Sequence, residues 1–283
     1  MNTNPSLAGN VALITGASRG IGFAIAERLA ELGARVAICS RDAHALEAAR
    51  SRLLSKSKDV FAMPADVASA AQISALVEKT AAHFGPIDFL INNAGTSRFG
   101  PVHECTENDW DTVLDTNLKG VFLASRAVIP GMISRRRGHI VNISSLAGKN
   151  SFAGGSLYCA SKWGLLGLTY CMAEDLRAYG IRVTAICPGS VATDFGHPPS
   201  AASPKSQPNA SPNAQPAPAE SSPAAHIKAQ PEASPNVLPA ELRKKDRSKM
   251  LQPSDVAHAV EMVLTAAPQS FISEILLRPT QKP

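Results

Sequence analysis

A tyrosine and a lysine four residues apart could exchange a proton with a substrate. Tyr158 and Lys162 fall near the start of an expected helix, where this spacing puts both side chains on one face, one turn apart. A free phenol has a pKa of about 10, too high for efficient proton exchange near neutral pH. A nearby ammonium favours the phenolate, so Lys162 would lower the pKa of Tyr158. Taken alone, such a pair is more often an amphipathic surface pair than a catalytic one.

Two further polar residues could assist this proton transfer. Ser145 follows an expected strand upstream of Tyr158, and its hydroxyl could stabilise negative charge developing on a substrate oxygen. The adjacent Ser144 competes for this role, and only the spacing to Tyr158 favours Ser145. Asn117, on a long expected helix, could hold a water molecule or a backbone group behind Lys162.

Glycines crowd the turn between the first expected strand and the first expected helix, at residues 15–22. Gly16 would permit the tight turn, Gly20 would let a pyrophosphate approach, and Gly22 would let helix and strand pack closely. The following helix offers free N–H groups and a positive dipole end to the phosphates. Such a turn can also be purely structural, but its place between strand and helix favours a dinucleotide site.

The end of the second expected strand bears on the choice of dinucleotide. An acid there would bind the ribose 2′-hydroxyl of NAD, whereas this sequence has Ser40 followed by Arg41. Arg41, and Arg19 from the glycine-rich turn, could pair with a 2′-phosphate. The sequence therefore predicts NADP(H) in preference to NAD(H), although both arginines could instead be solvent-exposed without a ligand.

The ends of the next two strands complete the predicted nucleotide site. Asp66, beside Val67, could accept a hydrogen bond from the adenine amino group, or it could cap the following helix. Small residues at 92–95, Asn-Asn-Ala-Gly, would give the nucleoside close access to the backbone.

Short apolar runs alternate with helical patterns along most of the chain. We expect strands at 11–14, 35–39, 60–63, 87–91, 140–143, 182–186 and 271–277, and helices at 21–32, 46–53, 73–84, 106–130, 156–178 and 253–264. This pattern predicts an α/β fold, a single-domain Rossmann-like doubly wound parallel sheet with helices on both faces. Ligands of such sheets bind at the carboxyl ends of the strands, and each motif above lies at such an end or on the helix that follows.

The composition changes after the sixth strand. Residues 197–240 contain eleven Pro, eleven Ala and seven Ser, which cannot bury enough apolar surface to offset their ordering entropy. We expect a disordered low-complexity insertion there. Residues 1–196 and 241–283 would form one dinucleotide-binding and catalytic domain, because the terminal piece is too small to fold alone.

Taken together, the motifs resemble those of the short-chain dehydrogenase/reductase superfamily, of the NADP-preferring type with TGxxxGIG and YxxxK motifs. The resemblance covers residues 8–196 and, more weakly, 251–277. It rests on TGASRGIG at 15–22, NNAG at 92–95, Asn117, Ser145, YCASK at 158–162 and PGSVAT at 188–193, in the family's order. It implies hydride transfer to or from a nicotinamide, with Tyr158 as acid or base, Lys162 on the nicotinamide ribose, Ser145 orienting the carbonyl and Asn117 supporting a proton relay.

The resemblance also implies a cofactor-binding set and an assembly. The set comprises Gly16, Ser18, Arg19, Gly20, Ile21, Gly22, Arg41, Asp66, Val67, Asn93, Ala94, Gly95, Tyr158, Lys162, Pro188, Gly189, Val191 and Thr193. A homodimer or homotetramer would form through the helices at 106–130 and 156–178. The insertion stands where the family has a helical lid over the substrate, and Leu-Leu-Arg-Pro at 276–279 replaces its glycine-rich ending. The resemblance therefore does not identify the substrate.

Composition argues against several other classes of protein. The net charge of +5 is a mild excess, and the basic runs at 135–137 and 241–249 are interpreted as solvated rather than as a nucleic-acid site, although the second could attract an acidic acyl carrier. Five cysteines form no CxxC pair and no histidines pair at metal spacing, so we expect reduced thiols, no metal and a cytoplasmic protein. No signal peptide or transmembrane-length run is visible, so no membrane partner is expected.

Two functions of different classes follow. The first is an NADPH-dependent oxidoreductase that transfers a hydride to a ketone or 3-oxoacyl carbonyl, or oxidises the corresponding alcohol. The second is a non-catalytic nucleotide-binding regulator or scaffold that uses the Pro-rich segment as an arm. Tyr158→Phe should abolish turnover in the first case and leave the second unaffected.

Overall fold

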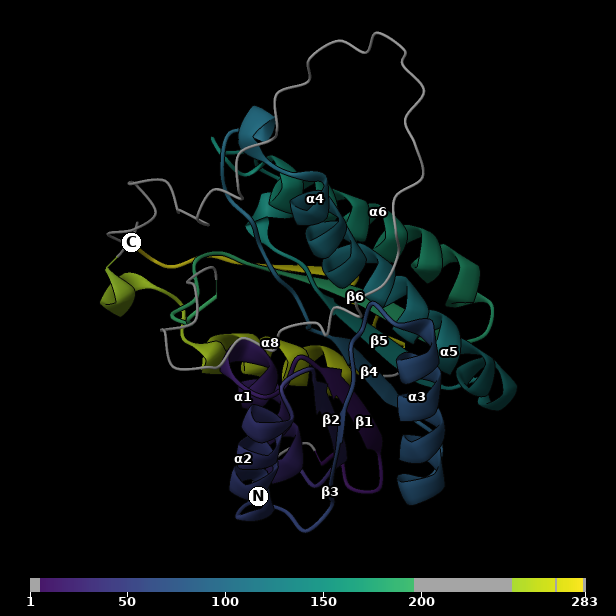
Figure 1. Ribbon diagram of the computed structural model, residues 1–283. Coiled ribbons are helices and arrows are strands. Elements are labelled where there is room, and N and C mark those ends of the chain that lie inside the picture. Colours follow the sequence, from purple (N-terminus) through teal and green to yellow (C-terminus); the bar gives the residue numbers. More distant parts are fainter. Residues whose placement is uncertain (1–5, 196–245, 268, 282–283) are drawn as a thin grey trace, which may run out of the picture.

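A seven-stranded parallel sheet runs through the middle of the protein (Figure 1). The computed structural model describes residues 6–195, 246–267 and 269–281. The strand order is β3-β2-β1-β4-β5-β6-β7, and every neighbouring pair is parallel. The sheet confirms the predicted Rossmann-like α/β class. The expected disorder of 197–240 lies outside the described residues.

The strands and helices alternate along the chain, as predicted. The strands are β1 (Val11–Thr15), β2 (Arg35–Ser40), β3 (Val60–Pro64), β4 (Phe89–Asn92), β5 (Gly138–Ile143), β6 (Ile181–Pro188) and β7 (Glu274–Leu277). The α-helices are α1 (Gly20–Glu31), α2 (Ala43–Leu54), α3 (Ala70–Phe84), α4 (Glu107–Leu114), α5 (Gly120–Arg135), α6 (Ser156–Arg177) and α8 (Pro253–Thr265).

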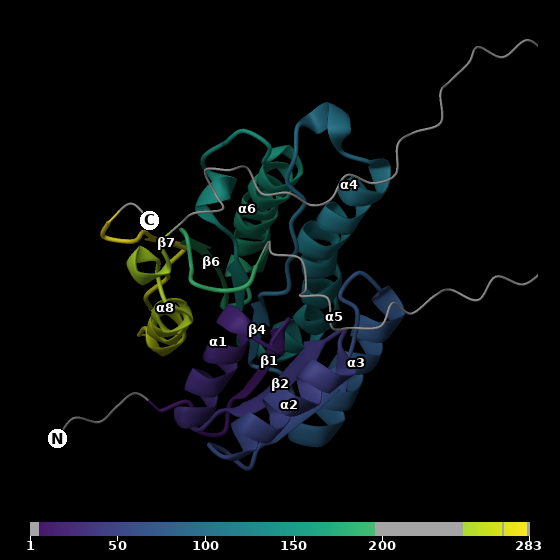
Figure 2. The same ribbon diagram turned by 60° about the vertical axis from the view of Figure 1, so that its left-hand side comes forward.

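Both faces of the sheet are buried, and the alternation along each strand divides the core in two. Ala12 and Ile14 of β1 pack on the face covered by α1, α2 and α8. Val11 and Leu13 pack on the opposite face, against α3, α5 and α6. Figure 2 shows α3 and α5 on the other side of the sheet from α1 and α8. All five residues of β1 are buried, which explains why the strands are apolar throughout rather than in alternation.

The topology reverses direction beside β1, because β1 lies between β2 and β4. Successive connections therefore run to opposite sides of this point. Loops that leave the carboxyl ends of β1 and β4 diverge, which leaves a crevice there for a ligand. The glycine-rich turn after β1 and the Asn-Asn-Ala-Gly segment at the end of β4 both lie at this point.

The C-terminal residues extend the same sheet. Strand β7 pairs in parallel with β6, with Ile186 opposite Ile275, and forms the expected edge. Helix α8 packs against α1, where Arg28 and Glu261 form two hydrogen bonds of 2.7 and 2.8 Å. The division of the chain into one domain and an insertion agrees with this docking and remains a prediction.

The single helix expected at 106–130 is wrong in two respects. Thr106 and Asp109 do form the expected capping box at its start. The helix is then interrupted by a π-helical turn, Asp115–Lys119, and α5 continues past Pro130 to Arg135. The backbone stays helical through the π turn, so a run of helical pattern on both sides of it predicts a single regular helix.

No helix in the described part of the chain is both long and apolar enough to cross a membrane.

Candidate active site

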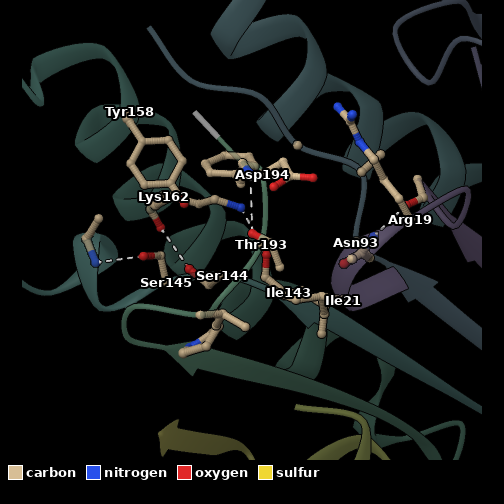
Figure 3. Close-up of a pocket in the computed structure, with 18 of the residues that line it drawn as sticks. Arg19, Ile21, Asn93, Ile143, Ser144, Ser145, Tyr158, Lys162, Thr193 and Asp194 are labelled. Carbon is tan, nitrogen blue, oxygen red and sulfur yellow. Dashed lines mark hydrogen bonds between the residues drawn. The ribbon is translucent and has the colours of Figure 1, made fainter. Parts of the chain in front are cut away.

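A cavity of about 1430 Å³ opens at the carboxyl ends of the strands (Figure 3). In Figure 3, Tyr158, Lys162 and Ser145 lie on one side of it, and Arg19 and Asn93 lie on the other. Most of the predicted site residues line this cavity. Gly22, Asp66 and Asn117 do not line it, and they act from behind it or beside it.

Two glycines in the turn after β1 are required by close contacts. Gly16 has a positive φ of 64°, and a Cβ there would lie 2.7 Å from the Cα of Ala94. A Cβ on Gly22 would collide with the side-chain amide of Asn93 and lie 2.5 Å from the carbonyl oxygen of Gly16. Gly22 thus allows the turn to pack tightly, as predicted, although its immediate neighbours are Asn93 and Gly16 rather than the strand as a whole.

Side chains hold the ends of β1 and β4 together beneath the cavity. The Oγ1 atom of Thr15 accepts hydrogen bonds from the backbone N–H groups of Asn93 and Ala94, both 3.1 Å. The amide of Asn93 donates to the carbonyl oxygens of Thr15 and Gly16 at 2.9 and 3.0 Å. The floor of the cavity is therefore fixed before any ligand binds.

The N-terminus of α1 faces this floor without a side-chain cap. Arg19 occupies the N-cap position and makes no capping hydrogen bond, and the first turn carries no acidic residue. The free N–H groups and the helix dipole are thus available to an anion. Gly20, at the first position of α1, is close to Thr193, because a Cβ there would lie 3.4 Å from the Thr193 methyl group.

Arg19 and Arg41 both line the cavity, together with Ser40 and Asp42. Asp42 is an acid that follows the end of β2 by two residues and is not among the predicted site residues. Its Oδ1 atom accepts a hydrogen bond of 3.0 Å from the N–H of Ala45 and caps α2. This carboxylate is therefore engaged in the helix cap, and the two arginines supply the positive charge at this end.

Two roles were predicted for Asp66, a cap on the following helix and a contact with adenine. The cap of α3 is Ser69, so the capping role considered for Asp66 is wrong. The Asp66 carboxylate accepts a hydrogen bond of 3.0 Å from the N–H of Ala68, in a turn of its own. Val67 lines the cavity beside it, and the adenine contact of Asp66 remains a prediction.

Burial dominates the charge states of Tyr158 and Lys162. It raises the pKa of Tyr158 to about 12, against the opposing effect of a hydrogen bond with Ser145. It lowers the pKa of Lys162 to about 8. The Nζ atom of Lys162 donates to the carbonyl oxygen of Ile143 at 2.9 Å and lies 5.9 Å from the centre of the Tyr158 ring. The expected lowering of the tyrosine pKa is not seen, because burial of the phenol raises it.

The structure distinguishes the two neighbouring serines. Ser145 is the serine whose hydroxyl opposes the effect of burial on the pKa of Tyr158, and its Oγ atom accepts from the N–H of Ala147 at 3.0 Å. Ser144 is buried, and its hydroxyl points to the backbone carbonyl of Lys162 at 3.5 Å. This arrangement favours Ser145 as the residue that meets a substrate.

Asn117 clamps a backbone group behind the cavity, which was one of its two expected roles. It is fully buried in the π turn. Its Oδ1 accepts from the N–H of Thr96 at 2.8 Å, and its Nδ2 donates to the carbonyl oxygen of Thr96 at 2.8 Å and to Ser161 at 3.0 Å. Asn117 thus fixes the segment after β4 against α6.

Several lining residues were not found from the sequence. Three phenylalanines, Phe99, Phe152 and Phe195, come from separate loops. Arg247 and Met250 come from the far side of the 196–245 segment. No periodic pattern marks single residues in loops, so only the folded chain brings them together.

Comparison with known proteins agrees with this geometry. The family model "short chain dehydrogenase" matches residues 10–203. The chain belongs to this family. Its relative "Granaticin polyketide synthase putative ketoacyl reductase 1" from Streptomyces violaceoruber is 44% identical over 185 residues, which are 65% of this chain and 68% of the relative. A 3-oxoacyl-(acyl-carrier-protein) reductase from Staphylococcus aureus is 41% identical over 185 residues, 65% of this chain and 75% of the relative.

A solved structure extends the similarity over nearly the full length. A metagenomic short-chain oxidoreductase in complex with NADP has a TM-score of 0.73 and 36% identity, and covers 98% of this chain and 99% of its own. Membership of the short chain dehydrogenase family makes this chain an oxidoreductase. In the described residues, no group of three or more His, Cys, Asp or Glu side chains could hold a metal ion.

Proposed function

We propose that this short chain dehydrogenase uses NADPH to reduce a ketone or 3-oxoacyl carbonyl to an alcohol, or catalyses the reverse oxidation. One observation carries the proposal. Tyr158, Ser145 and the buried Lys162 line the same cavity as the glycine-rich turn. A dinucleotide bound along that turn would bring its nicotinamide to this group.

The residues present fit NADP(H). The tight turn at Gly16 and Gly22 leaves no room for side chains, and the uncapped start of α1 suits a pyrophosphate. Arg19 and Arg41 lie where they could pair with a 2′-phosphate, while the nearby Asp42 is engaged in a helix cap. The similar structure that contains NADP supports the same choice.

When bound, the nicotinamide supplies a hydride to the carbonyl carbon. Tyr158 donates its proton to the carbonyl oxygen, and Ser145 donates a hydrogen bond to the same oxygen. Lys162 binds the nicotinamide ribose, and Asn117 keeps the Thr96 backbone in place behind it. Because burial raises the pKa of Tyr158, the phenol holds its proton at neutral pH and is ready to act as an acid. Reduction is therefore favoured at neutral pH, and alcohol oxidation at higher pH.

The test is turnover of NADPH with a panel of ketones and 3-oxoacyl thioesters, for the wild type and Tyr158→Phe. The variant should lose about 10²–10⁴-fold in kcat, because it lacks the general acid, and should keep the Kd of NADPH measured by fluorescence titration. A wild type that binds NADPH but reduces no carbonyl would instead favour the regulator or scaffold.

We also propose that copies of this chain pair through α4, α5 and α6. Large apolar side chains are exposed on these helices, namely Trp110, Phe122 and Trp163, and exposed apolar patches of this kind mark interaction surfaces. Light scattering after size-exclusion chromatography should give a dimer or tetramer. A Trp163→Asp variant should shift it toward the monomer, and an unshifted mass would contradict the proposal.

A cytoplasmic location and a one-domain organisation complete the proposal. All five cysteines are free thiols, which suits a reducing compartment. The docking of α8 and β7 supports one domain from 1–196 and 241–283. Limited proteolysis should cut first within 197–240 and leave the two pieces associated, and early cutting elsewhere would contradict it.

An acyl-carrier contact at the basic stretch 241–249 receives less support. Of its cations, the structure describes Arg247 and Lys249. They already pair with Asp194 at 3.3 Å and Asp246 at 3.7 Å.

A further inference from the structure

Three phenylalanines gather around Tyr158 from three separate connections. Phe99 lies in the segment after β4, Phe152 lies before α6, and Phe195 lies after β6. All three line the cavity on which Tyr158 opens. None of them is needed for proton transfer or for a dinucleotide.

Their rings form a continuous aromatic wall with Tyr158. The centres of the Phe99 and Tyr158 rings are 5.8 Å apart at 70°, and those of Tyr158 and Phe195 are 5.7 Å apart at 52°. The Phe99 and Phe152 rings are 5.9 Å apart at 51°. These are the separations and tilts at which aromatic pairs attract one another. All four residues line the cavity, so the wall offers it an aromatic surface.

The protein itself buries only part of the aromatic surface of this wall. Phe152 is 38% exposed and Phe195 is 43% exposed, so both carry apolar surface that a ligand could remove from water. Ring faces offer no strong hydrogen-bond partner to the hydroxyl groups of a sugar or polyol, so hydroxyl groups that face these rings would lose hydration. A flat apolar group loses little hydration and gains edge-to-face contacts.

We propose that this wall binds an aromatic group next to the reacting carbonyl, so that the substrates are aromatic ketones and the corresponding benzylic alcohols. The inference rests on the proposed function. In the reduction, the carbonyl carbon gains a hydride from NADPH and the oxygen gains the proton of Tyr158. The C=O π bond is lost, and the products are the secondary alcohol, NADP⁺ and a tyrosinate that regains its proton from water.

The first test compares ketones with the purified full chain and saturating NADPH. Acetophenone and cyclohexyl methyl ketone have the same carbon skeleton, but only the first has a flat ring. We expect kcat/KM for acetophenone to exceed that for cyclohexyl methyl ketone about tenfold, and both to exceed that for dihydroxyacetone and for an acetoacetyl thioester. Equal values, or a preference for dihydroxyacetone or the acetoacetyl thioester, would overturn the inference.

The second test removes the rings but keeps apolar volume. Phe152→Leu and Phe195→Leu should each lower the ratio of kcat/KM for acetophenone to that for cyclohexyl methyl ketone several-fold. Phe271→Leu is the matched control, since Phe271 is 39% exposed and lies away from the cavity. The Kd of NADPH and the circular dichroism spectrum report folding in each variant. An unchanged ratio in both wall variants would also overturn the inference.

The two proposals fail in different ways. If NADPH binds and no carbonyl in the panel is reduced, the proposed function falls, and this inference with it. If carbonyls are reduced with no preference for the aromatic ring, the proposed function stands and only the aromatic wall is refuted.

Discussion

A buried histidine should make this protein lose stability in mild acid. His139 on β5 is 1% exposed, and its Nε2 lies 2.8 Å from the Oγ1 of Thr184 on β6. The Thr184 hydroxyl donates its only proton to the carbonyl oxygen of Ile272 at 2.6 Å. Thr184 must therefore accept from His139, which fixes the proton on Nε2. The other ring nitrogen, Nδ1, is buried without a hydrogen-bond partner.

Protonation would place an N–H with no acceptor, and a full charge, inside the sheet. Burial and the nearby Arg182 guanidinium lower the pKa of His139 from 6.5 to about 3. In the unfolded chain the ring takes up a proton below pH 6.5, whereas in the folded chain it resists until about pH 3. Stability from this residue is therefore complete above pH 6.5 and is lost as the pH falls. Each pH unit costs about 1.4 kcal/mol, so the loss at pH 5 is about 2 kcal/mol.

The measurement is the free energy of unfolding by urea at pH 7 and pH 5, at one fixed protein concentration, because assembly would add a concentration term. His139→Gln keeps an N–H for Thr184 but cannot titrate. The fall between pH 7 and pH 5 should be about 2 kcal/mol smaller in this variant than in the wild type. His103→Gln, at an exposed histidine, is the control and should keep the wild-type fall. Equal falls in wild type and His139→Gln would refute the tautomer argument.

Three further predictions test the cofactor end and the C-terminal dock. Arg41→Ala should lower kcat/KM for NADPH about 10–100-fold, because one charge-assisted contact with the 2′-phosphate is lost, and should leave kcat/KM for NADH unchanged. An unchanged ratio of kcat/KM for NADPH to kcat/KM for NADH would contradict this prediction. Gly22→Ala should abolish NADPH binding and lower Tm, because its Cβ would collide with the side-chain amide that ties β1 to β4, whereas Gly131→Ala, with open space around it, should do neither. Glu261→Gln should lower the free energy of unfolding by urea by about 1 kcal/mol, because it breaks the paired contact with Arg28, and no change would show that α8 docks without it.

The strand–helix alternation is legible in the sequence because burial on both faces leaves strands such as β1 apolar throughout. The same reasoning fails at Asp115–Lys119. Apolar residues continue on both sides of the π turn, so the pattern predicts a regular helix where the helical segment contains a π turn. Asn117, inside this turn, hydrogen-bonds the backbone of Thr96, a contact between separate parts of the chain that periodicity does not reveal.

In the candidate active site, the sequence predicts the positions of the residues but not their charge states. Residue types and spacing predict that Tyr158 and Lys162 share one face of a helix, and the structure brings both to the cavity. They do not predict the charge states, since the pKa values depend on how deeply each group is buried and on which carbonyl holds the ammonium. The carbonyl belongs to Ile143 at the end of β5, whereas Lys162 lies on α6.

The substrate end is the least predictable part because it is built from connections rather than elements. Phe195 and Arg247 lie on either side of the 196–245 segment, yet the chain on both sides is held at the cavity mouth. Val191 bridges Leu251 in parallel, and Arg247 pairs with Asp194 at 3.3 Å. Because the cost of closing a connection grows only with the logarithm of its length, chain can be added between two such fixed ends without disturbing the sheet. The floor of the cofactor site cannot take added chain in this way, because Thr15 and the other hydrogen bonds between the ends of β1 and β4 fix it. Its residues therefore stand in short motifs that the sequence reveals. The aromatic residues at the substrate end come from separate loops and are found only in the folded structure.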